Sequence, residues 1–402
     1  MKYDFTSIMD RHGKDAAAVD AIGVWKFAPK PPKEGFSFLP MWVADMNFAT
    51  APSITEAIMD RVSHPAFGYF ETSDEYYDAI IRWQKTHNGV EGLEKKHIGY
   101  ENGVLGGVNS ALSYSAEPGD AILLHSPTYI GFTMTLNNNG YHIVHSPLKQ
   151  DENGIYRMDF EDMDRKIKEH NIHTAIFCSP HNPTGRAWER WELEKAAEVY
   201  ERNQVTVICD EIWSDLLLNG NQHIPFQSIS QYAHDNTAAF YAPSKTFNLA
   251  GLIGSYHIIY NDKMRERIVA HGDKTHYNSM NVLSMHALVG GYKAEGEEWL
   301  SQLCQVLSDN VNYACDFIKN ELEGVEVTRP EATYMLFIDA GKWCEAHGKT
   351  ITDVLHAGWE VGVGWQDGVM FHGPTHIRMN LALPHSQVVE AFDRLKKYVF
   401  VD

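Results

Sequence analysis

Residues 240–251 read FYAPSKTFNLAG and carry Lys245 near their middle. The apolar and aromatic residues 237–242 predict a short buried strand that ends at Pro243, and residues 252–260 predict another. A lysine between two core strands is held on a fixed loop at an edge of the sheet. Because lysine is rarely buried without a partner, the alternative interpretation is a solvated turn lysine.

Three more apolar strands are predicted upstream, within residues 121–132, 175–186 and 205–213. Just past its carboxyl end, each strand is followed by one polar or aromatic residue, and in chain order these are Tyr129, Asn182 and Asp210. Ligands of open α/β sheets bind at the carboxyl ends of the strands. The sequence therefore predicts that these three residues and Lys245 converge at one edge of a sheet.

The composition limits the kinds of partner. The chain has 402 residues, of which 44% are hydrophobic and 12% aromatic, so it is long enough for two domains, or for one large domain with a lobe, and can form a real core. Its net charge of −19 disfavours binding to nucleic acids and to anionic membrane surfaces. We therefore expect no nucleic acid and no membrane as partners.

Targeting and redox features are sparse. The first residues lack an apolar signal core, and no apolar run reaches the length of a membrane span. The five cysteines form no C-x-x-C pair, and Cys178 and Cys209 lie in predicted core strands, where inert thiols are expected. The 21 histidines show no H-E-x-x-H spacing. These patterns predict a reduced cytoplasmic protein without a metal site.

The order of elements predicts the α/β class. Residues 121–260 alternate short strands with helices, which is typical of a doubly wound, mostly parallel sheet. Residues 279–322 are helical, with glycines that indicate a break, and after Gly324 strands and helices predict a smaller α/β lobe. We expect an N-terminal arm over residues 1–50 that packs with the small domain, a large domain over 51–290 and a small C-terminal domain over 291–402.

Glycines open a predicted helix within residues 99–120. They match neither G-x-G-x-x-G nor a P-loop, so the sequence shows no nucleotide fingerprint there. The free backbone N–H groups at a helix start and the positive end of the helix dipole nevertheless favour a phosphate.

Three motifs in a fixed order resemble one enzyme family. They are NPTG at residues 182–185, Asp210 in CDEIW, and the pair Ser244-Lys245. Together they resemble the fold-type I enzymes that depend on pyridoxal 5′-phosphate, the aminotransferase class I/II superfamily, over nearly the whole chain. The resemblance implies a large domain with a mostly parallel sheet, a smaller C-terminal α/β domain and pyridoxal phosphate as cofactor.

The resemblance also implies roles at the predicted sheet edge. Lys245 would hold the cofactor aldehyde and, as a free amine, move the Cα proton of the substrate. Asp210 would pair with the pyridine nitrogen, the alternative being a cap on the next helix. Asn182 would donate to the phenolic oxygen while also serving its turn. Tyr129 would stack on the pyridine ring, the alternative being a core aromatic residue.

Further residues are implied for the cofactor phosphate and for the substrate. The hydroxyl of Ser244 and the backbone N–H groups of Val104 and Leu105 would bind the phosphate. Tyr69 would reach the same phosphate from the neighbouring subunit, which implies an obligate homodimer with shared active sites. Arg378 lies in mid-strand and would bind the substrate carboxylate through its forked guanidinium, the alternative being a salt bridge between the lobes.

Residues 41–50, MWVADMNFAT, narrow the resemblance to the cystathionine β-lyase, or carbon–sulfur lyase, branch, in which Asp is more frequent than Asn47. The segments FGY, CDEIWSDL, HIPF and PSKTFNLAGL agree with this branch. Trp42, Met46 and Phe48 either line the substrate or simply pack in the core. The branch implies an amino-acid substrate, L-cystathionine or a related cysteine S-conjugate, and α,β-elimination to a thiol, pyruvate and ammonia.

Two other functions stay open. An aminotransferase shares the first half of the chemistry, but aspartate-type enzymes carry Tyr in place of Trp213 and a phosphate-binding Arg in place of Ile253. A non-catalytic, pyridoxal phosphate-binding regulator would need a DNA-binding domain, for which the chain has neither spare N-terminal length nor a basic region. An S-x-x-K match at residues 146–149 lacks the companion motifs of a serine hydrolase.

Overall fold

The computed structural model describes residues 1–401. Their contacts form two compact units. Unit 1 consists of Met1–Ala49, Asn182–Gly185 and Gln302–Asp402, and unit 2 of Thr50–His181 and Arg186–Ser301. The NPTG segment therefore belongs to unit 1, although the chain on both sides of it belongs to unit 2. The division into residues 1–50, 51–290 and 291–402 stays a prediction.

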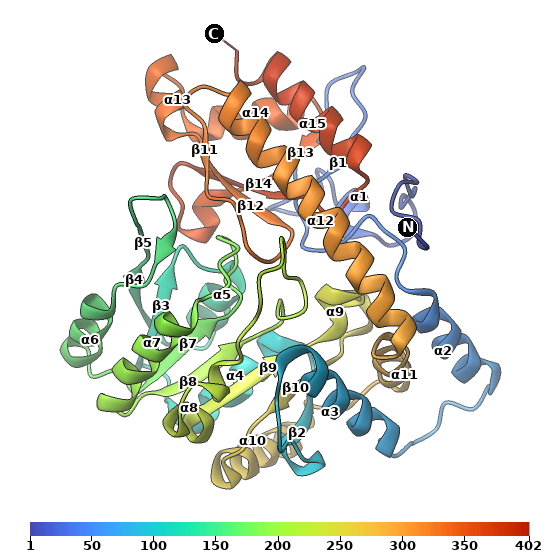
Figure 1. Cartoon of the computed structure of the whole chain (residues 1–402), viewed down its shortest axis with the longest axis vertical. Coiled ribbons are helices and arrows are strands. Elements are labelled where there is room, and N and C mark those ends of the chain that lie inside the picture. Colours follow the sequence, from blue (N-terminus) through green and yellow to red (C-terminus); the bar gives the residue numbers. More distant parts are fainter. Residues whose placement is uncertain (402) are drawn as a thin grey trace. The chain divides into compact units, whose positions relative to one another are not determined.

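Unit 2 is built on a seven-stranded sheet in the order β2-β10-β9-β8-β7-β3-β4 (Figure 1). Its strands are β2 (Ile98–Glu101), β3 (Ala121–Ser126), β4 (His142–Pro147), β7 (Thr174–Cys178), β8 (Thr206–Asp210), β9 (Thr237–Tyr241) and β10 (Ser255–Ile258). The strands from β9 to β4 run parallel, whereas β10 is antiparallel to both β9 and β2. The predicted mostly parallel α/β sheet is confirmed. The exception, β10, follows a link whose only helices are α9 (Pro243–Thr246) and one 3-10 turn, whereas parallel crossovers usually carry a full helix.

The central strands are buried on both faces, which explains their continuous apolar runs. Ile176 and Ile208 belong to a core cluster with α4 (Val104–Ser115), α5 (Ile130–Asn138) and α10 (Asp262–Thr275). The next residue of β7, Phe177, points to the other face, because successive side chains alternate. There its ring contacts Phe226, which in turn contacts Tyr200 of α7 (Arg190–Arg202). Helices α6 (Phe160–Glu169) and α8 (Gln231–Asn236) pack beside α7.

The remaining helices of unit 2 begin and end where the sequence indicated. Helix α2 (Pro52–Ser63) has proline at its first position, and α3 (Asp74–Asn88) ends at Gly89, whose φ of 66° is left-handed. The break expected in residues 279–322 separates α11 (Val282–Gly291) from α12 (Ala294–Glu321). A Cβ atom added at Gly296 would stand 1.9 Å from the carbonyl oxygen of Gly291, so the chain needs glycine at this bend.

Unit 1 contains a four-stranded antiparallel sheet in the order β11-β12-β15-β14. The strands are β11 (Glu326–Val327), β12 (Met335–Asp339), β14 (Gln366–Asp367) and β15 (His376–Asn380), and its helices include α13 (Gly341–His347), α14 (Ile351–Glu360) and α15 (His385–Tyr398). The N-terminal residues have only the one-turn helix α1 (Ala17–Asp20) and the short strand β1 (Leu39–Pro40). β1 pairs in parallel with β13 (Val363–Gly364), which fastens this segment to the C-terminal part of unit 1.

No helix within residues 1–401 combines the length and the apolar character that crossing a bilayer requires.

Candidate active site

Three neighbouring strands of unit 2 end at the same level (Figure 1). Cys178 of β7 lies opposite Asp210 of β8, and Asp210 lies opposite Phe240 of β9. Two backbone hydrogen bonds extend this alignment past the strands, from Ser179 N–H to the Asp210 carbonyl and from Glu211 N–H to the Phe240 carbonyl, both 2.9 Å long. The segments that carry Asp210 and Lys245 therefore leave the sheet at one edge.

Asp210 has a buried carboxyl group. Its Oδ1 atom accepts a hydrogen bond of 3.0 Å from the N–H of Ile212, and the residue is only 4% exposed. Loss of solvation raises the Asp210 pKa to about 7, while the Ile212 N–H and the charge of Lys245 act in the opposite direction. Turns follow Asp210 in place of a helix, which argues against the capping alternative. A buried carboxyl with this pKa suits a cationic partner such as a protonated pyridine nitrogen.

Lys245 lies in α9, the four-residue helix that follows β9. The residue is partly buried, which argues against a fully solvated turn lysine. Its Nζ atom is 5.6 Å from the centroid of the Trp213 ring, a distance typical of a cation–π contact. Trp213 itself is 2% exposed. The lysine amine therefore has an aromatic face beside it, and its charge lowers the pKa of Asp210 against the effect of burial.

The start of α4 fits a phosphate. The cap residue of this helix is Gly103, which has a φ of 78° and no side chain that could cap the helix. The N–H groups of Val104 and Leu105 belong to the first turn, where no carbonyl of the helix itself is available to them. Both the open N–H groups and the helix dipole favour an anion there.

Tyr129 lies beside this helix start. It is the cap residue of α5 and packs, with Leu105, against the core cluster that contains Val104 and Ala242. A Cβ atom added at Gly131 would stand 2.4 Å from the Tyr129 ring and 2.8 Å from Leu105 Cδ1. Unit 2 thus brings the Tyr129 ring and the start of α4 into one core cluster. Ala242, which directly precedes the segment from Pro243 to Lys245, belongs to the same cluster.

Unit 1 holds Arg378 together with Asn182. Arg378 is 3% exposed, and its Nη1 donates to Asn182 Oδ1 at 3.3 Å. Its Nη2 donates to Gln366 Oε1 at 2.6 Å and to the Trp42 carbonyl at 3.1 Å, and its Cζ atom lies 4.3 Å from the centroid of the Phe371 ring. These acceptors carry no formal charge, so a substrate carboxylate would be a stronger partner than any of them.

Gln366 and Phe371 are contacts of Arg378 that the sequence reasoning missed. Gln366 lies opposite Arg378 on the neighbouring strand, a pairing that appears only once β14 and β15 are side by side. Trp42 contributes its backbone carbonyl, and its side chain is buried against Ala21 and Ala28. The Trp42 ring thus packs in the core of unit 1.

Tyr69 is a surface residue of the single chain. It lies between α2 and α3, and it is fully exposed, with a relative accessibility of 111%. Phe67 at 56% and Met59 at 62% are exposed on the same part of the chain.

Glu211 is a second buried carboxylate that the sequence reasoning did not assign. It accepts hydrogen bonds from the Tyr241 hydroxyl and from the Phe226 N–H, at 2.6 and 3.0 Å, and lies 2.6 Å from His223 Nε2. His223 and Phe226 belong to the HIPF segment. This motif therefore supplies two of the partners that hold Glu211, the residue next to Asp210. In the sequence, the only indication of Glu211 was its position directly after Asp210 in CDEIW.

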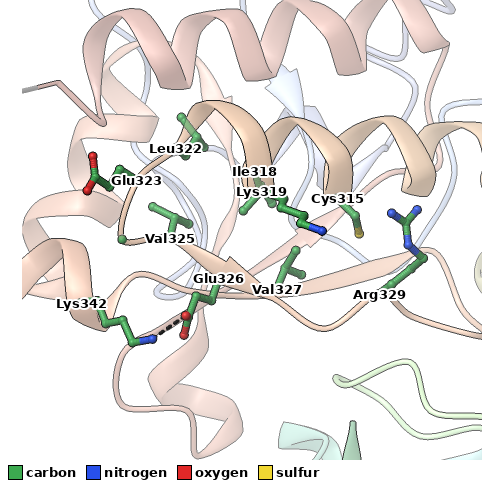
Figure 2. Close-up of a pocket in the computed structure, with 11 residues that line it drawn as sticks. Cys315, Ile318, Lys319, Leu322, Glu323, Val325, Glu326, Val327, Arg329 and Lys342 are labelled. Atoms are coloured by element: carbon green, nitrogen blue, oxygen red, sulfur yellow. Dashed lines mark hydrogen bonds and ion pairs between the residues drawn. The ribbon is translucent and has the colours of Figure 1, made fainter. Parts of the chain in front are cut away.

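Unit 1 also contains a pocket of about 570 Å³. It is formed by the end of α12 and by β11, and it includes none of the predicted site residues (Figure 2). Three cationic side chains line it, Lys319, Arg329 and Lys342, and the last two are paired with Asp316 and Glu326. Within the described chain, no group of three or more His, Cys, Asp or Glu side chains could hold a metal ion.

Comparison with known proteins adds independent findings. The family model for aminotransferase class I and II matches residues 41–395. Cystathionine beta-lyase PatB of Bacillus subtilis (strain 168) is 36% identical over 301 residues, 75% of this chain and 77% of that protein. Protein MalY of Escherichia coli (strain K12) is 30% identical over 339 residues, 84% of each.

Two solved structures are similar over their whole length. The pyridoxal phosphate-bound C–S lyase of Staphylococcus hominis has a TM-score of 0.89 at 30% identity, covering 100% of this chain and 99% of that one. Cystalysin of Treponema denticola, which contains pyridoxal 5′-phosphate, has a TM-score of 0.90 at 29% identity, covering 99% and 98%.

Proposed function

The chain belongs to the aminotransferase class I and II family, and we propose that within this family it is a carbon–sulfur lyase acting on L-cystathionine or a related cysteine S-conjugate. Its cofactor is pyridoxal 5′-phosphate. The names of the relatives, a cystathionine beta-lyase at 36% identity and a C–S lyase over the whole chain, support the lyase reaction. The observation that carries the proposal most directly is the partly buried amine of Lys245 acting on the buried carboxyl of Asp210.

The residues of unit 2 are assigned to the cofactor and to proton transfer. When bound, the cofactor supplies a pyridine ring that accepts the electron pair left when the Cα–H bond breaks. Lys245 holds the aldehyde carbon and, once released, takes the Cα proton. Asp210 keeps the ring nitrogen protonated. The N–H groups of Val104 and Leu105 and the hydroxyl of Ser244 hold the phosphate, and Tyr129 stacks on the ring.

The residues of unit 1 are assigned to orientation. Arg378 binds the substrate α-carboxylate through two parallel charge-assisted hydrogen bonds, which fix the plane of the carboxylate. The amide oxygen of Asn182 accepts from Arg378, so its NH₂ group is the donor for the phenolic oxygen of the cofactor. Arg378 thereby selects the bond to Cα that breaks.

The proposed reaction balances. A cysteine thioether and one water give a thiol, pyruvate and ammonia. The Cα proton passes to the Lys245 amine, and the sulfur leaves Cβ with the electron pair of the C–S bond. The product thiolate then takes up a proton.

Incubation of the purified protein with L-cystathionine tests this function, with pyruvate and free thiol measured together. A lyase releases the two in equal amounts without a second substrate. An aminotransferase would need an added 2-oxo acid and would release no thiol, and a regulator would do neither. Either of those results would overturn the proposal. We also propose a cytoplasmic location, which is supported by the five free cysteines.

Arg378→Lys should raise KM for L-cystathionine about tenfold or more while the absorption of the bound cofactor stays nearly unchanged. Lysine keeps the charge but loses the fork, and one charge-assisted hydrogen bond contributes about 1.5–3 kcal/mol. Steady-state kinetics and the visible spectrum measure both effects. As a control, Arg329→Lys changes an exposed arginine of unit 1 and should leave KM unaltered. An unchanged KM for Arg378→Lys would place this residue outside the substrate site.

We further propose a homodimer in which Tyr69 donates to the cofactor phosphate of the neighbouring subunit. The complete exposure of Tyr69 in the single chain, beside exposed Phe67 and Met59, supports a covering partner. Tyr69→Phe should then raise the Kd for pyridoxal phosphate at least about tenfold, because a bond to a charged acceptor is lost.

Fluorescence titration of the apoprotein with pyridoxal phosphate measures this Kd. Tyr398→Phe removes a hydroxyl from another exposed tyrosine, 45% accessible, and serves as the matched control. Light scattering that finds a fully active monomer would refute the intersubunit contact.

A further inference from the structure

Helix α9 has too little structure of its own to fix Lys245. It comprises only Pro243–Thr246, and helices this short are marginal without tertiary contacts. Two backbone hydrogen bonds close its turns, from Phe247 N–H to the Pro243 carbonyl at 2.9 Å and from Leu249 N–H to the Ser244 carbonyl at 3.0 Å. The position of the Lys245 amine must therefore be set by side chains around the helix.

Asp215 makes the bridging contact to this helix. Its Oδ2 atom accepts from the Thr246 hydroxyl at 2.7 Å, and its Oδ1 atom accepts from Trp83 Nε1 at 3.0 Å. Thr246 is completely buried, so the loss of this acceptor would be costly. One carboxylate thus joins α9 to α3.

Trp83, which donates to the Asp215 carboxylate, is itself held by stacking contacts. Its ring stacks on Tyr292 at a centroid distance of 4.3 Å and an interplanar angle of 6°, and on His87 at 3.7 Å and 17°. It also contacts the edge of Phe247, the residue that follows α9. With its ring stacked on two neighbours, Trp83 presents Nε1 in a fixed place.

Residues 213–215 touch the lysine helix twice. Trp213 lies 5.6 Å from Lys245 Nζ, and Asp215, two residues later, binds Thr246, the residue after the lysine. These two contacts fix the amine relative to the aromatic face.

We propose that Asp215 is a positioning residue for Lys245, because by joining Thr246 to Trp83 it keeps the lysine amine over the face of Trp213. This inference rests on the proposed function, in which Lys245 holds the cofactor. Asp215 acts through Thr246 and needs no contact with cofactor or substrate.

A pair of variants at Thr246 tests the hydrogen bond in the holoenzyme. Thr246→Val keeps the shape but removes the hydroxyl, and Thr246→Ser keeps the hydroxyl. The visible absorption of the cofactor bound at Lys245 changes with pH as the nitrogen of Lys245 loses its proton, and the midpoint of this change is the readout. The Trp213 face favours the protonated nitrogen. Loss of the hydrogen bond in Thr246→Val should let the nitrogen of Lys245 move away from the Trp213 face. The midpoint should then shift downward by about half a pH unit or more, given the size of cation–π attractions.

Kinetics supply a second readout. Thr246→Val should lower kcat about tenfold to a hundredfold with KM nearly unchanged, because a small displacement of a reacting group has effects of this size. Thr246→Ser should restore both the midpoint and kcat. Thr275→Val removes the hydroxyl of an exposed threonine on α10 that donates to the His271 carbonyl, and it should change neither.

Each outcome decides the question. If both Thr246 variants keep the wild-type midpoint, or if Thr246→Val only lowers the melting temperature, Asp215 has no positioning role. If Thr246→Val does not fold, Asp215→Ala, which removes both acceptors, replaces it, and the same downward shift is expected or the proposal is rejected. A wild-type protein in which borohydride fixes no cofactor on Lys245 would instead overturn the proposed function itself.

Discussion

Lys245→Ala is expected to lower kcat for pyruvate formation from L-cystathionine at least about ten-thousand-fold, since one substitution removes the cofactor anchor and the base. Borohydride treatment followed by peptide mass analysis should fix pyridoxal phosphate on Lys245 in the wild type and nowhere in the variant. The protein should still fold, because Lys245 is only partly buried and α9 is held through its buried neighbour Thr246.

Lys195→Ala is the control for this substitution. Lys195 pairs with Glu198 on the surface of α7, where an ion pair contributes little, so activity should be retained. Activity of Lys245→Ala within tenfold of the wild type would remove Lys245 from the chemistry and with it the central assignment.

Asp210→Asn is expected to have two opposite effects. Turnover should fall by orders of magnitude and the cofactor should be released more easily, because an amide cannot hold the ring nitrogen protonated. The apoprotein, however, should become more stable at pH 8. In the folded wild type, burial raises the Asp210 pKa from 3.8 to about 7, so the folded state binds this proton more tightly than the unfolded state does.

The upward shift of the Asp210 pKa determines how the stability of the folded apoprotein depends on pH. The contribution of Asp210 to stability is fully present below pH 3.8 and is lost as pH rises through about 7. At pH 8 the loss is on the order of a few kcal/mol. Asparagine does not ionise, so urea unfolding of the Asp210→Asn apoprotein should lack this decline between pH 5 and pH 8.

Urea unfolding of both apoproteins at the two pH values measures the difference. Equal declines in wild type and variant would show that another group causes the pH dependence. Kinetics of Asp210→Asn that match the wild type would show that this carboxyl serves only its local contact with Ile212.

Much of the fold was predictable because its signals are local. Apolar runs of about five residues, such as those that became β7, β8 and β9, are bounded by proline, glycine or a carboxylate, and such runs specify buried parallel strands. The end of α3 at Gly89 was likewise indicated by a single residue, and the break between α11 and α12 by glycines. The α/β class followed from the order of the predicted strands and helices, and the family and the cofactor followed from the order of three short motifs. The comparisons confirm all three.

The direction of β10 and the grouping of residues 182–185 with unit 1 were not predictable in this way. Both depend on where the chain returns after a connection, and local periodicity does not carry that information. The contacts of Arg378 were not predictable for the same reason, because Gln366 and Trp42 reach it from other segments of unit 1.

By itself, the sequence determined which residues could perform the chemistry: a lysine after one strand, a carboxylate after another and glycines at a helix start. Only the tertiary structure decided what holds them. Asp215 is separated from Thr246 by 31 positions and from Trp83 by 132, and in the sequence it is an ordinary turn residue. The physical reason is that strands and helices form from neighbouring residues, whereas a buried hydrogen bond joins donors and acceptors that meet only after the chain has folded.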